Sequence, residues 1–179
     1  MSYTIIIVFI LTIAFFFNKI HLLKPRRNIR NEYLDLLKTL AEQNMYKNEV
    51  PVSAILVFED KIIGTGRNTM VEENKISAHA ELNALNEAFK KFGDDFYNLP
   101  KRNFILYTTF EPCPMCQGAL LQHGITKICY DEKKNFQENL KLKFRSWLFH
   151  LKKTRFKSNN LQKDLFLKHP SFRKHHNLN

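Results

Sequence analysis

The sequence predicts an α/β fold that is preceded by one transmembrane helix. Between residues 31 and 130, short apolar runs alternate with longer segments of helical periodicity. This order predicts a sheet with at least partly parallel strands and helices on both faces. Residues 3–17 are almost wholly apolar, and a helix extended through Leu23 would be about 31 Å long, close to the thickness of a bilayer's hydrocarbon core.

The basic residues next to this apolar run all lie on its C-terminal side, at Lys24, Arg26, Arg27 and Arg30. The positive-inside rule therefore predicts a single-pass membrane protein, anchored through residues 3–23, in which the domain that follows the anchor is cytoplasmic. A cleaved signal peptide is the alternative, and a buried helix is the third interpretation. No charge precedes the run, and Leu22–Pro25 makes a poor cleavage site, so the anchor is favoured.

Periodicity and turn residues divide the next part of the chain into elements. A leucine stripe predicts a helix over residues 31–47, and Ser77 is the expected N-cap of a helix over 78–92. A polar connection over 93–102 follows that helix. The other expected elements are strands over 50–58, 61–66, 103–109 and 125–130 and a helix over 113–123. We expect three parts: the anchor at 1–30, a core at 31–132 and a basic helical tail at 133–179.

Two short motifs bring metal-binding residue types into the core. His79 and Glu81 form an H-x-E motif, and Cys113 and Cys116 form a P-C-x-x-C motif with Pro112. Two cysteines three residues apart at a helix start lie on one face, where the helix dipole favours thiolates. One imidazole and two thiolates leave tetrahedral zinc one open position, which is the catalytic arrangement. Glu81 is then free to transfer protons.

Two other interpretations of the cysteines compete with this one. A redox dithiol would explain Cys113 and Cys116 but not His79 and Glu81. A structural zinc site would need a fourth ligand such as Cys129, which lies in an expected strand, where small buried cysteines are common. Because the chain holds three cysteines, a disulfide framework is not expected. The catalytic zinc site is favoured.

The paired motifs resemble those of the zinc-dependent cytidine deaminase superfamily, whose members carry an H-x-E and a P-C-x-x-C signature. The resemblance runs from about residue 31 to 134 and is closest to the branch of bacterial tRNA wobble-adenosine deaminases and guanine deaminases. Segments 49–57 and 63–68 resemble that branch's opening hairpin. The resemblance implies a three-layer α/β/α sandwich around a mixed sheet, and a homodimer.

The resemblance also implies roles for individual residues. His79, Cys113 and Cys116 would bind one zinc ion, and Glu81 would be the catalytic acid and base. Asn68 and the backbone amide of Ala80 would bind the substrate; a turn residue is the alternative interpretation of Asn68. The reaction would be hydrolytic deamination of an amino-bearing nucleobase by zinc-bound hydroxide, with release of ammonia.

The identity of the base stays open, because Lys75-Ile76-Ser77 stands where that branch usually carries Asp-Pro-Thr. Adenosine in tRNA is the first candidate, and free guanine, cytosine or a nucleoside is the alternative. A catalytically silent zinc-fold binding protein is a further alternative. Residues 133–179 contain 13 Lys and Arg against two acidic residues. This tail is interpreted as a helix that covers the sheet, binds RNA phosphates or binds anionic lipid.

Overall fold

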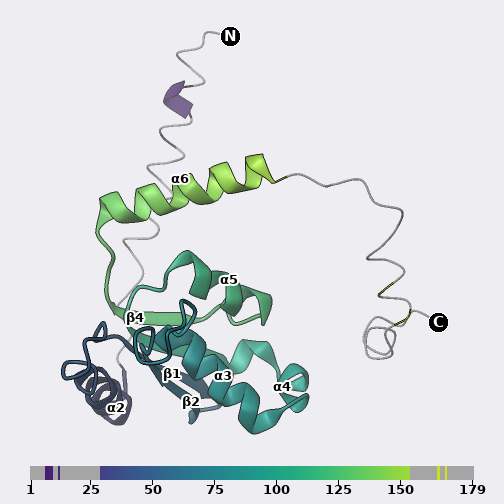
Figure 1. Cartoon of the computed structure of the whole chain (residues 1–179). Coiled ribbons are helices and arrows are strands. Elements are labelled where there is room, and N and C mark those ends of the chain that lie inside the picture. The colour runs from purple at the N-terminus through teal and green to yellow at the C-terminus, as the bar shows by residue number, and fades with distance from the viewer. Residues whose placement is uncertain (1–6, 10–11, 13–28, 154–164, 166–167, 169–179) are drawn as a thin grey trace. The chain divides into compact units, whose positions relative to one another are not determined.

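The computed structural model describes residues 7–9, 12, 29–153, 165 and 168. These form two compact units, divided between Lys134 and Asn135. The first unit holds a four-stranded sheet in the order β2-β1-β3-β4, of which Figure 1 labels β1, β2 and β4. Strand β1 (Ser53–Phe58) pairs antiparallel with β2 (Lys61–Arg67) and β3 (Phe104–Phe110), whereas β3 and β4 (Ile128–Glu132) are parallel. The sheet is therefore mixed, as the alternation of elements predicted.

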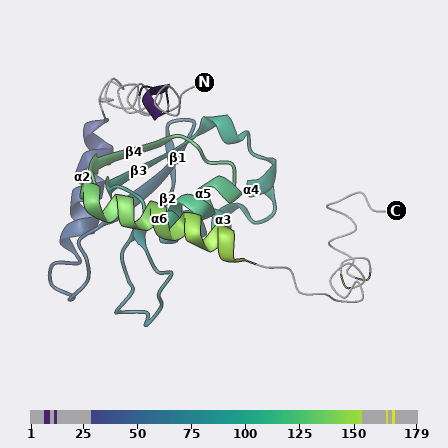
Figure 2. The same ribbon diagram turned by 90° about the horizontal axis from the view of Figure 1, so that it is seen from above.

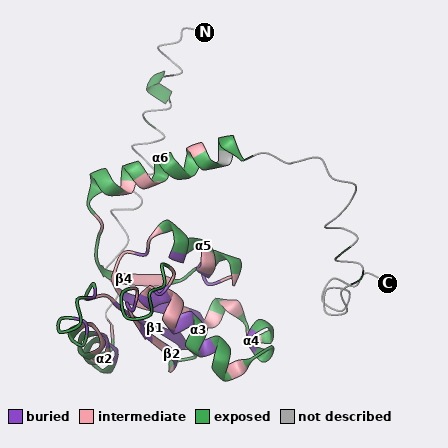
Figure 3. Cartoon of the chain, viewed as in Figure 1, coloured by how far each residue is buried: buried purple, intermediate pink, exposed green. Residues whose placement is uncertain are grey.

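The sheet carries helices on both faces because side chains alternate along β1. Ile55 and Val57 pack against Tyr33 and Leu37 of α2 (Asn31–Glu42) on one face. Ala54 and Leu56 join the cluster on the other face, where α3 (Ala80–Phe92) and α5 (Pro114–Gln122) contribute. Figure 2 shows the strands with these helices from above, and in Figure 3 the buried residues are concentrated in the strands and in α3.

Helix α3 packs very closely on β2 because two glycines face it. A Cβ atom added to Gly64 would lie 2.1 Å from the Ala84 carbonyl oxygen, and one on Gly66 would lie 2.1 Å from that of Ala80. Both distances are far below van der Waals contact, so this approach requires glycine. The end of β2 is thereby held against the first turn of α3, next to His79.

Strand β2 lies at one edge of the sheet, where α3 also supplies a polar cover. The Glu87 carboxylate accepts a hydrogen bond from the backbone N–H of Thr65 and another from its hydroxyl, both at 2.6 Å. A strand-edge donor that would otherwise face solvent therefore has a partner.

Most boundaries differ from the sequence-based prediction by a few residues. The connection expected to be irregular contains α4 (Asp95–Asn98) and the 3-10 turn η1 (Lys101–Asn103). Phe96 of α4 is fully buried, so this connection contributes to the core. The predicted N-cap of α3 was wrong: it is His79, because Ala78 and its neighbours form a turn in which Ala78 N–H bonds to the Lys75 carbonyl.

The prediction of a transmembrane helix over residues 3–23 was wrong. In the described part of the chain, no helix combines the length and the apolar character that a membrane crossing needs. Such a crossing takes roughly 20 residues, whereas within that segment helix is described only for residues 7–9 and 12. The other residues of the segment lie outside the described part. The predicted single-pass membrane localisation with a cytoplasmic catalytic domain was wrong for the same reason.

The second unit contains the helix α6 (Phe136–Lys152), which begins with a side-chain cap. The Asn135 side chain accepts a hydrogen bond from the Gln137 N–H at 3.0 Å. Phe144 and Trp147 stack on one side of the helix with ring centroids 5.7 Å apart. Its basic residues are Lys141, Lys143, Arg145 and Lys152. The predicted domain boundaries after residues 30 and 132 stay predictions.

Candidate metal centre

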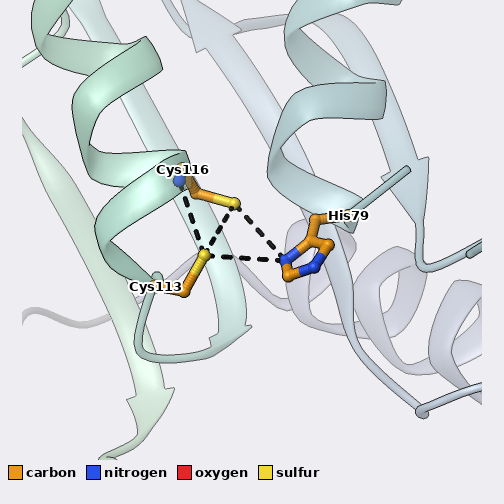
Figure 4. A group of neighbouring side chains, drawn as sticks. All are labelled: His79, Cys113 and Cys116. Carbon is orange, nitrogen blue, oxygen red and sulfur yellow. Dashed lines mark hydrogen bonds between the residues drawn. The ribbon is translucent and has the colours of Figure 1, made fainter. Parts of the chain in front are cut away.

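Three predicted ligands from two helix starts come together in the first unit (Figure 4). The Cys113 and Cys116 sulfur atoms are 3.5 Å apart, and they lie 3.7 and 3.6 Å from Nδ1 of His79. Tetrahedral zinc with Zn–S bonds of about 2.3 Å and Zn–N bonds of about 2.0 Å would separate its ligands by about 3.8 Å (S–S) and about 3.5 Å (S–N). The three residues therefore fit zinc.

The local fold explains why these side chains converge. Cys113 is the N-cap of α5, with Pro114 at the first helical position, and its sulfur accepts a hydrogen bond from the Cys116 N–H at 3.5 Å. Cys116 follows within the first turn and is fully buried. His79 caps α3 with an extended backbone, so its ring leaves the helix start toward the two sulfurs.

The two thiols are electrostatically unequal. A hydrogen bond from Cys116, helped by backbone N–H groups and the nearby His79, lowers the pKa of Cys113 to about 5. The pKa of the Cys116 thiol is strongly raised by its hydrogen bond with Cys113, by its burial and by the nearby charge of Glu81. One thiolate and one thiol share a proton between them, and a metal cation would displace that proton.

Glu81 lies in the first turn of α3, two residues after His79, and only 4% of its surface is exposed. Burial raises the pKa of its carboxyl, and the negative charge of Cys113 raises it further. A carboxyl with a raised pKa beside the three candidate metal-ligand atoms is suited to accept and return protons.

The two predicted substrate-binding residues lie at the same end of the sheet. Asn68 directly follows β2 and is 4% exposed, and Ala80 is the first residue of α3. Asn83 of α3 connects the two segments, because its Nδ2 donates to the Arg67 carbonyl at 2.9 Å and to the Thr69 hydroxyl at 2.8 Å. Cys129, which the alternative would have used as a fourth ligand, is not part of the ligand group found among the described residues.

Sequence patterns assigned no role to Glu49, a buried carboxylate that accepts a hydrogen bond from the Asn68 side chain at 2.7 Å. Its position immediately before a run of apolar strand residues was the available signal. An acidic residue at the edge of a core needs donors, but the sequence does not reveal which donors those are.

Comparison with known proteins decides the family. A sequence model described as MafB19-like deaminase matches residues 29–169. The chain belongs to the MafB19-like deaminase family. This membership confirms the predicted place in the cytidine deaminase-like superfamily, and the match covers parts of both units.

Named relatives of this MafB19-like deaminase include a tRNA-specific adenosine deaminase of Buchnera aphidicola subsp. Schizaphis graminum, 44% identical over 100 residues. That match covers 53% of this chain and 62% of the relative. A second Buchnera aphidicola tRNA-specific adenosine deaminase, from subsp. Baizongia pistaciae, is 39% identical over 55% of this chain and 59% of its own length. The chain thus spans about three fifths of the length of these relatives.

Two solved structures share the fold. One, from work on A-to-I editing by tRNA:A34 deaminases, has a TM-score of 0.53 at 30% identity and covers 59% of this chain and 78% of that chain. The other is a guanine deaminase from Bacillus subtilis, with a TM-score of 0.58 at 25% identity over 77% of this chain and 92% of that chain.

Proposed function

We propose that this MafB19-like deaminase is a zinc-dependent enzyme that hydrolytically deaminates an amino-bearing nucleobase, with adenosine in tRNA as its first substrate. The observation that carries the proposal is the convergence of His79, Cys113 and Cys116 beside the buried carboxyl of Glu81. Three ligands and a separate proton carrier are the minimum for hydrolytic chemistry at a metal. The similarity to tRNA-specific adenosine deaminases supports the choice of base.

In this proposal His79 Nδ1 and the sulfurs of Cys113 and Cys116 hold the ion. Zinc, when bound, would supply a water molecule made acidic enough to react near neutral pH. Glu81 would take one proton from that water and deliver it to the ring nitrogen beside the amino-bearing carbon. It would then accept the remaining proton of the water, from the hydroxyl group now on that carbon, and pass it to the leaving amino group. One water is consumed, a C–O bond forms, the C–N bond breaks and ammonia leaves.

The other proposed roles concern the base itself. Asn68 would hydrogen-bond the ring, and the N–H of Ala80, which lies in the first turn of α3 where amides lack helical acceptors, would fix its orientation. The pKa of Glu81, raised by burial, fits a group that must hold a proton during part of the cycle. A homodimer, as the family resemblance implies, is part of the proposal.

Free guanine is the second candidate substrate, because the match to the Bacillus subtilis guanine deaminase covers 92% of that chain. Free cytosine and nucleosides belong to the same alternative class of small-molecule substrates. A protein that binds zinc without turnover is the third, and the presence of a buried Glu81 beside the ligands disfavours it.

Ammonia release by the zinc-loaded full chain tests the proposal. The panel comprises a tRNA with adenosine at the wobble position, adenosine, guanine, cytosine and cytidine, and Glu81→Gln is the control. We expect the wild-type chain to release ammonia from the tRNA and to leave inosine in the product, whereas the Glu81→Gln variant should release no ammonia. Release from guanine alone would move the assignment to the second candidate. If the chain binds zinc but releases ammonia from no compound of the panel, the third candidate, a zinc-binding protein without turnover, is the correct interpretation.

A further inference from the structure

The buried carboxylate of Glu49 connects two segments that lead to the proposed active site. Glu49 lies between α2 and β1 and is 6% exposed. One of its oxygens accepts from Nδ2 of Asn68 at 2.7 Å. The other accepts from the backbone N–H groups of Val71 and Glu72 at 2.7 and 2.8 Å. One side chain therefore holds both the candidate base-binding amide and the start of the segment that follows it.

That segment, residues 69–78, is a closed loop that leads to His79. The N–H of Thr69 donates to the Ala78 carbonyl at 2.9 Å, which brings the two ends of the loop together. The Thr69 hydroxyl donates to Glu73 at 2.7 Å and accepts from Asn83 of α3. Ala78 directly precedes His79, the proposed metal ligand. The hydrogen bonds of Glu49 therefore hold a loop that ends next to the candidate metal centre.

The backbone of Asn68 is fixed independently of Glu49. Its N–H donates to the Val52 carbonyl at 3.0 Å, and its carbonyl accepts from Nδ2 of Asn44 at 3.0 Å. Asn44 is fully buried and accepts from Arg67 at 3.0 Å. The main chain at Asn68 is thus held by Val52 and Asn44, and Glu49 is left to determine the orientation of the side-chain amide.

A carboxylate accepts hydrogen bonds but does not donate them, whereas the two ends of an asparagine amide have similar shapes and opposite hydrogen-bonding character. Facing Glu49, Asn68 must present its NH2 group, because its oxygen would meet another oxygen. The amide oxygen and the second N–H then remain for other partners. A half-turn of the amide would exchange a donor for an acceptor at every one of these positions.

We propose that Glu49 is a positioning residue that sets the orientation of the Asn68 amide, and so decides which hydrogen-bonding groups the enzyme offers to the base. The inference rests on the proposed function, since it takes Asn68 as a contact of the base. Glu49 acts through Asn68 and through the loop and does not itself reach the reacting atoms.

The substitution Glu49→Gln tests this inference because it keeps the shape and removes one acceptor. If the glutamine oxygen stays with Val71 and Glu72, its NH2 group meets that of Asn68. Two donors then face each other, and a half-turn of the Asn68 amide relieves the conflict. The matched control is Glu72→Gln, which changes a carboxylate of the same loop whose partners are Arg67 and Lys47 at 2.7 and 3.2 Å.

Three measurements on the zinc-loaded full chain separate the outcomes. The side-chain NH2 signals of Asn68 in a nitrogen–proton NMR spectrum, assigned by their loss in Asn68→Asp, should move in Glu49→Gln and stay in Glu72→Gln. The KM for the substrate found in the panel should rise about tenfold to a hundredfold in Glu49→Gln, the size expected for one mispaired buried hydrogen bond. The zinc content should stay at one per chain, and kcat should change much less than KM.

The double variant Glu49→Gln with Asn68→Asp adds a test that a purely structural role would not pass. Glutamine can donate to the new aspartate, so the melting temperature should recover toward that of wild type, whereas KM should stay high because the amide is gone. Unmoved Asn68 signals and an unchanged KM in Glu49→Gln, with a lower melting temperature, would overturn the inference and leave Glu49 as a loop anchor. If the wild-type chain deaminates no compound of the panel, the proposed function fails. The NMR signals of the Asn68 side-chain NH2 group then decide by themselves whether Glu49 sets the orientation of that amide.

Discussion

The Nδ1 atom of His79 lies 3.6 Å from the sulfur of Cys116, although 37 residues separate them. The first turns of α3 and α5 bring these atoms together, and both helices pack on the same face of the sheet. The candidate metal centre is thus built on two helices, and sites on helices or strands hold their side chains more precisely than sites on loops.

The first prediction concerns the ligands. Cys116→Ser should reduce zinc from about one ion per chain to below about a tenth and lower the melting temperature, because metal binding contributes to folding. Metal analysis and thermal unfolding measure both effects. Cys129→Ser is the control and should keep the zinc. Loss of zinc from that control would mean that the site has a fourth protein ligand and that its catalytic assignment is incorrect.

Zinc binding should also release a proton. The pKa of Cys113 is about 5, whereas that of Cys116 is raised. Above pH 7 Cys113 is therefore already a thiolate, and zinc has to displace the proton of Cys116 only. We expect release of about one proton per chain at pH 7.5 and an affinity that rises about tenfold per pH unit between pH 7 and 8.5. Competition titrations with a chelator measure the slope, and a slope near zero would contradict the shared-proton description.

The role of Glu81 can be separated from that of the ligands. Glu81→Gln should lower kcat by about a hundredfold to ten-thousandfold, the usual contribution of a general acid–base group, while zinc content stays near one per chain. Ammonia release and metal analysis on the same sample give both values. If zinc is lost together with activity, Glu81 holds the metal and the division of roles is incorrect.

The close packing of β2 on α3 predicts different effects for two Gly→Ala substitutions. Gly66→Ala should destabilise the chain by about 1–3 kcal/mol, because the added methyl group overlaps the Ala80 carbonyl and forces the helix start to move. Gly118→Ala, in helix α5 with nothing within 4 Å of the added methyl group, should be neutral or stabilise by about 1 kcal/mol. Urea unfolding compares them, and equal effects would show that β2 and α3 can separate at little cost.

The basic residues of α6 give a prediction that depends on tRNA being the substrate. If Lys141, Arg145 and Lys152 bind phosphates, tRNA affinity should fall steeply with salt. Changing all three to Ala should then flatten the log–log slope by roughly 0.7–0.9 for each phosphate that is no longer neutralised. Turnover of a free base should stay constant. Exposed lysines of the first unit, Lys38 and Lys61, changed to Ala provide the control. An unchanged slope in the α6 variant would show that this helix does not bind the RNA.

The sequence predicted the four strands and the helices α2, α3 and α5 of the first unit, but not α4, because local periodicity follows from burial on a sheet. The motifs indicated the group of His79, Cys113 and Cys116 because all three lie at helix starts, where spacing determines geometry. The last strand, expected over 125–130, was misplaced, since an apolar run does not reveal where pairing begins. Ile125 is fully buried yet precedes β4.

Other features were beyond local patterns. The hydrogen bonds of Glu49 reach residues about 20 positions away, and nothing in the neighbouring sequence indicates such partners. The apolar run at the N-terminus was interpreted from its length and its flanking charges, and in the described part of the chain no helix there is long and apolar enough to cross a membrane. The composition of a segment indicates which secondary structures it can adopt, whereas tertiary contacts determine which of them it adopts.

The carboxylate of Glu87 over Thr65 affects how this protein meets other chains. An open strand edge is a template on which a foreign strand can add, and chains that join in this way can grow into aggregates. At Thr65 an incoming strand would have to displace a 2.6 Å hydrogen bond and bring its own carbonyl oxygen against a negative charge. Helix α3, which starts at the candidate metal centre, therefore also hinders the addition of a strand at Thr65.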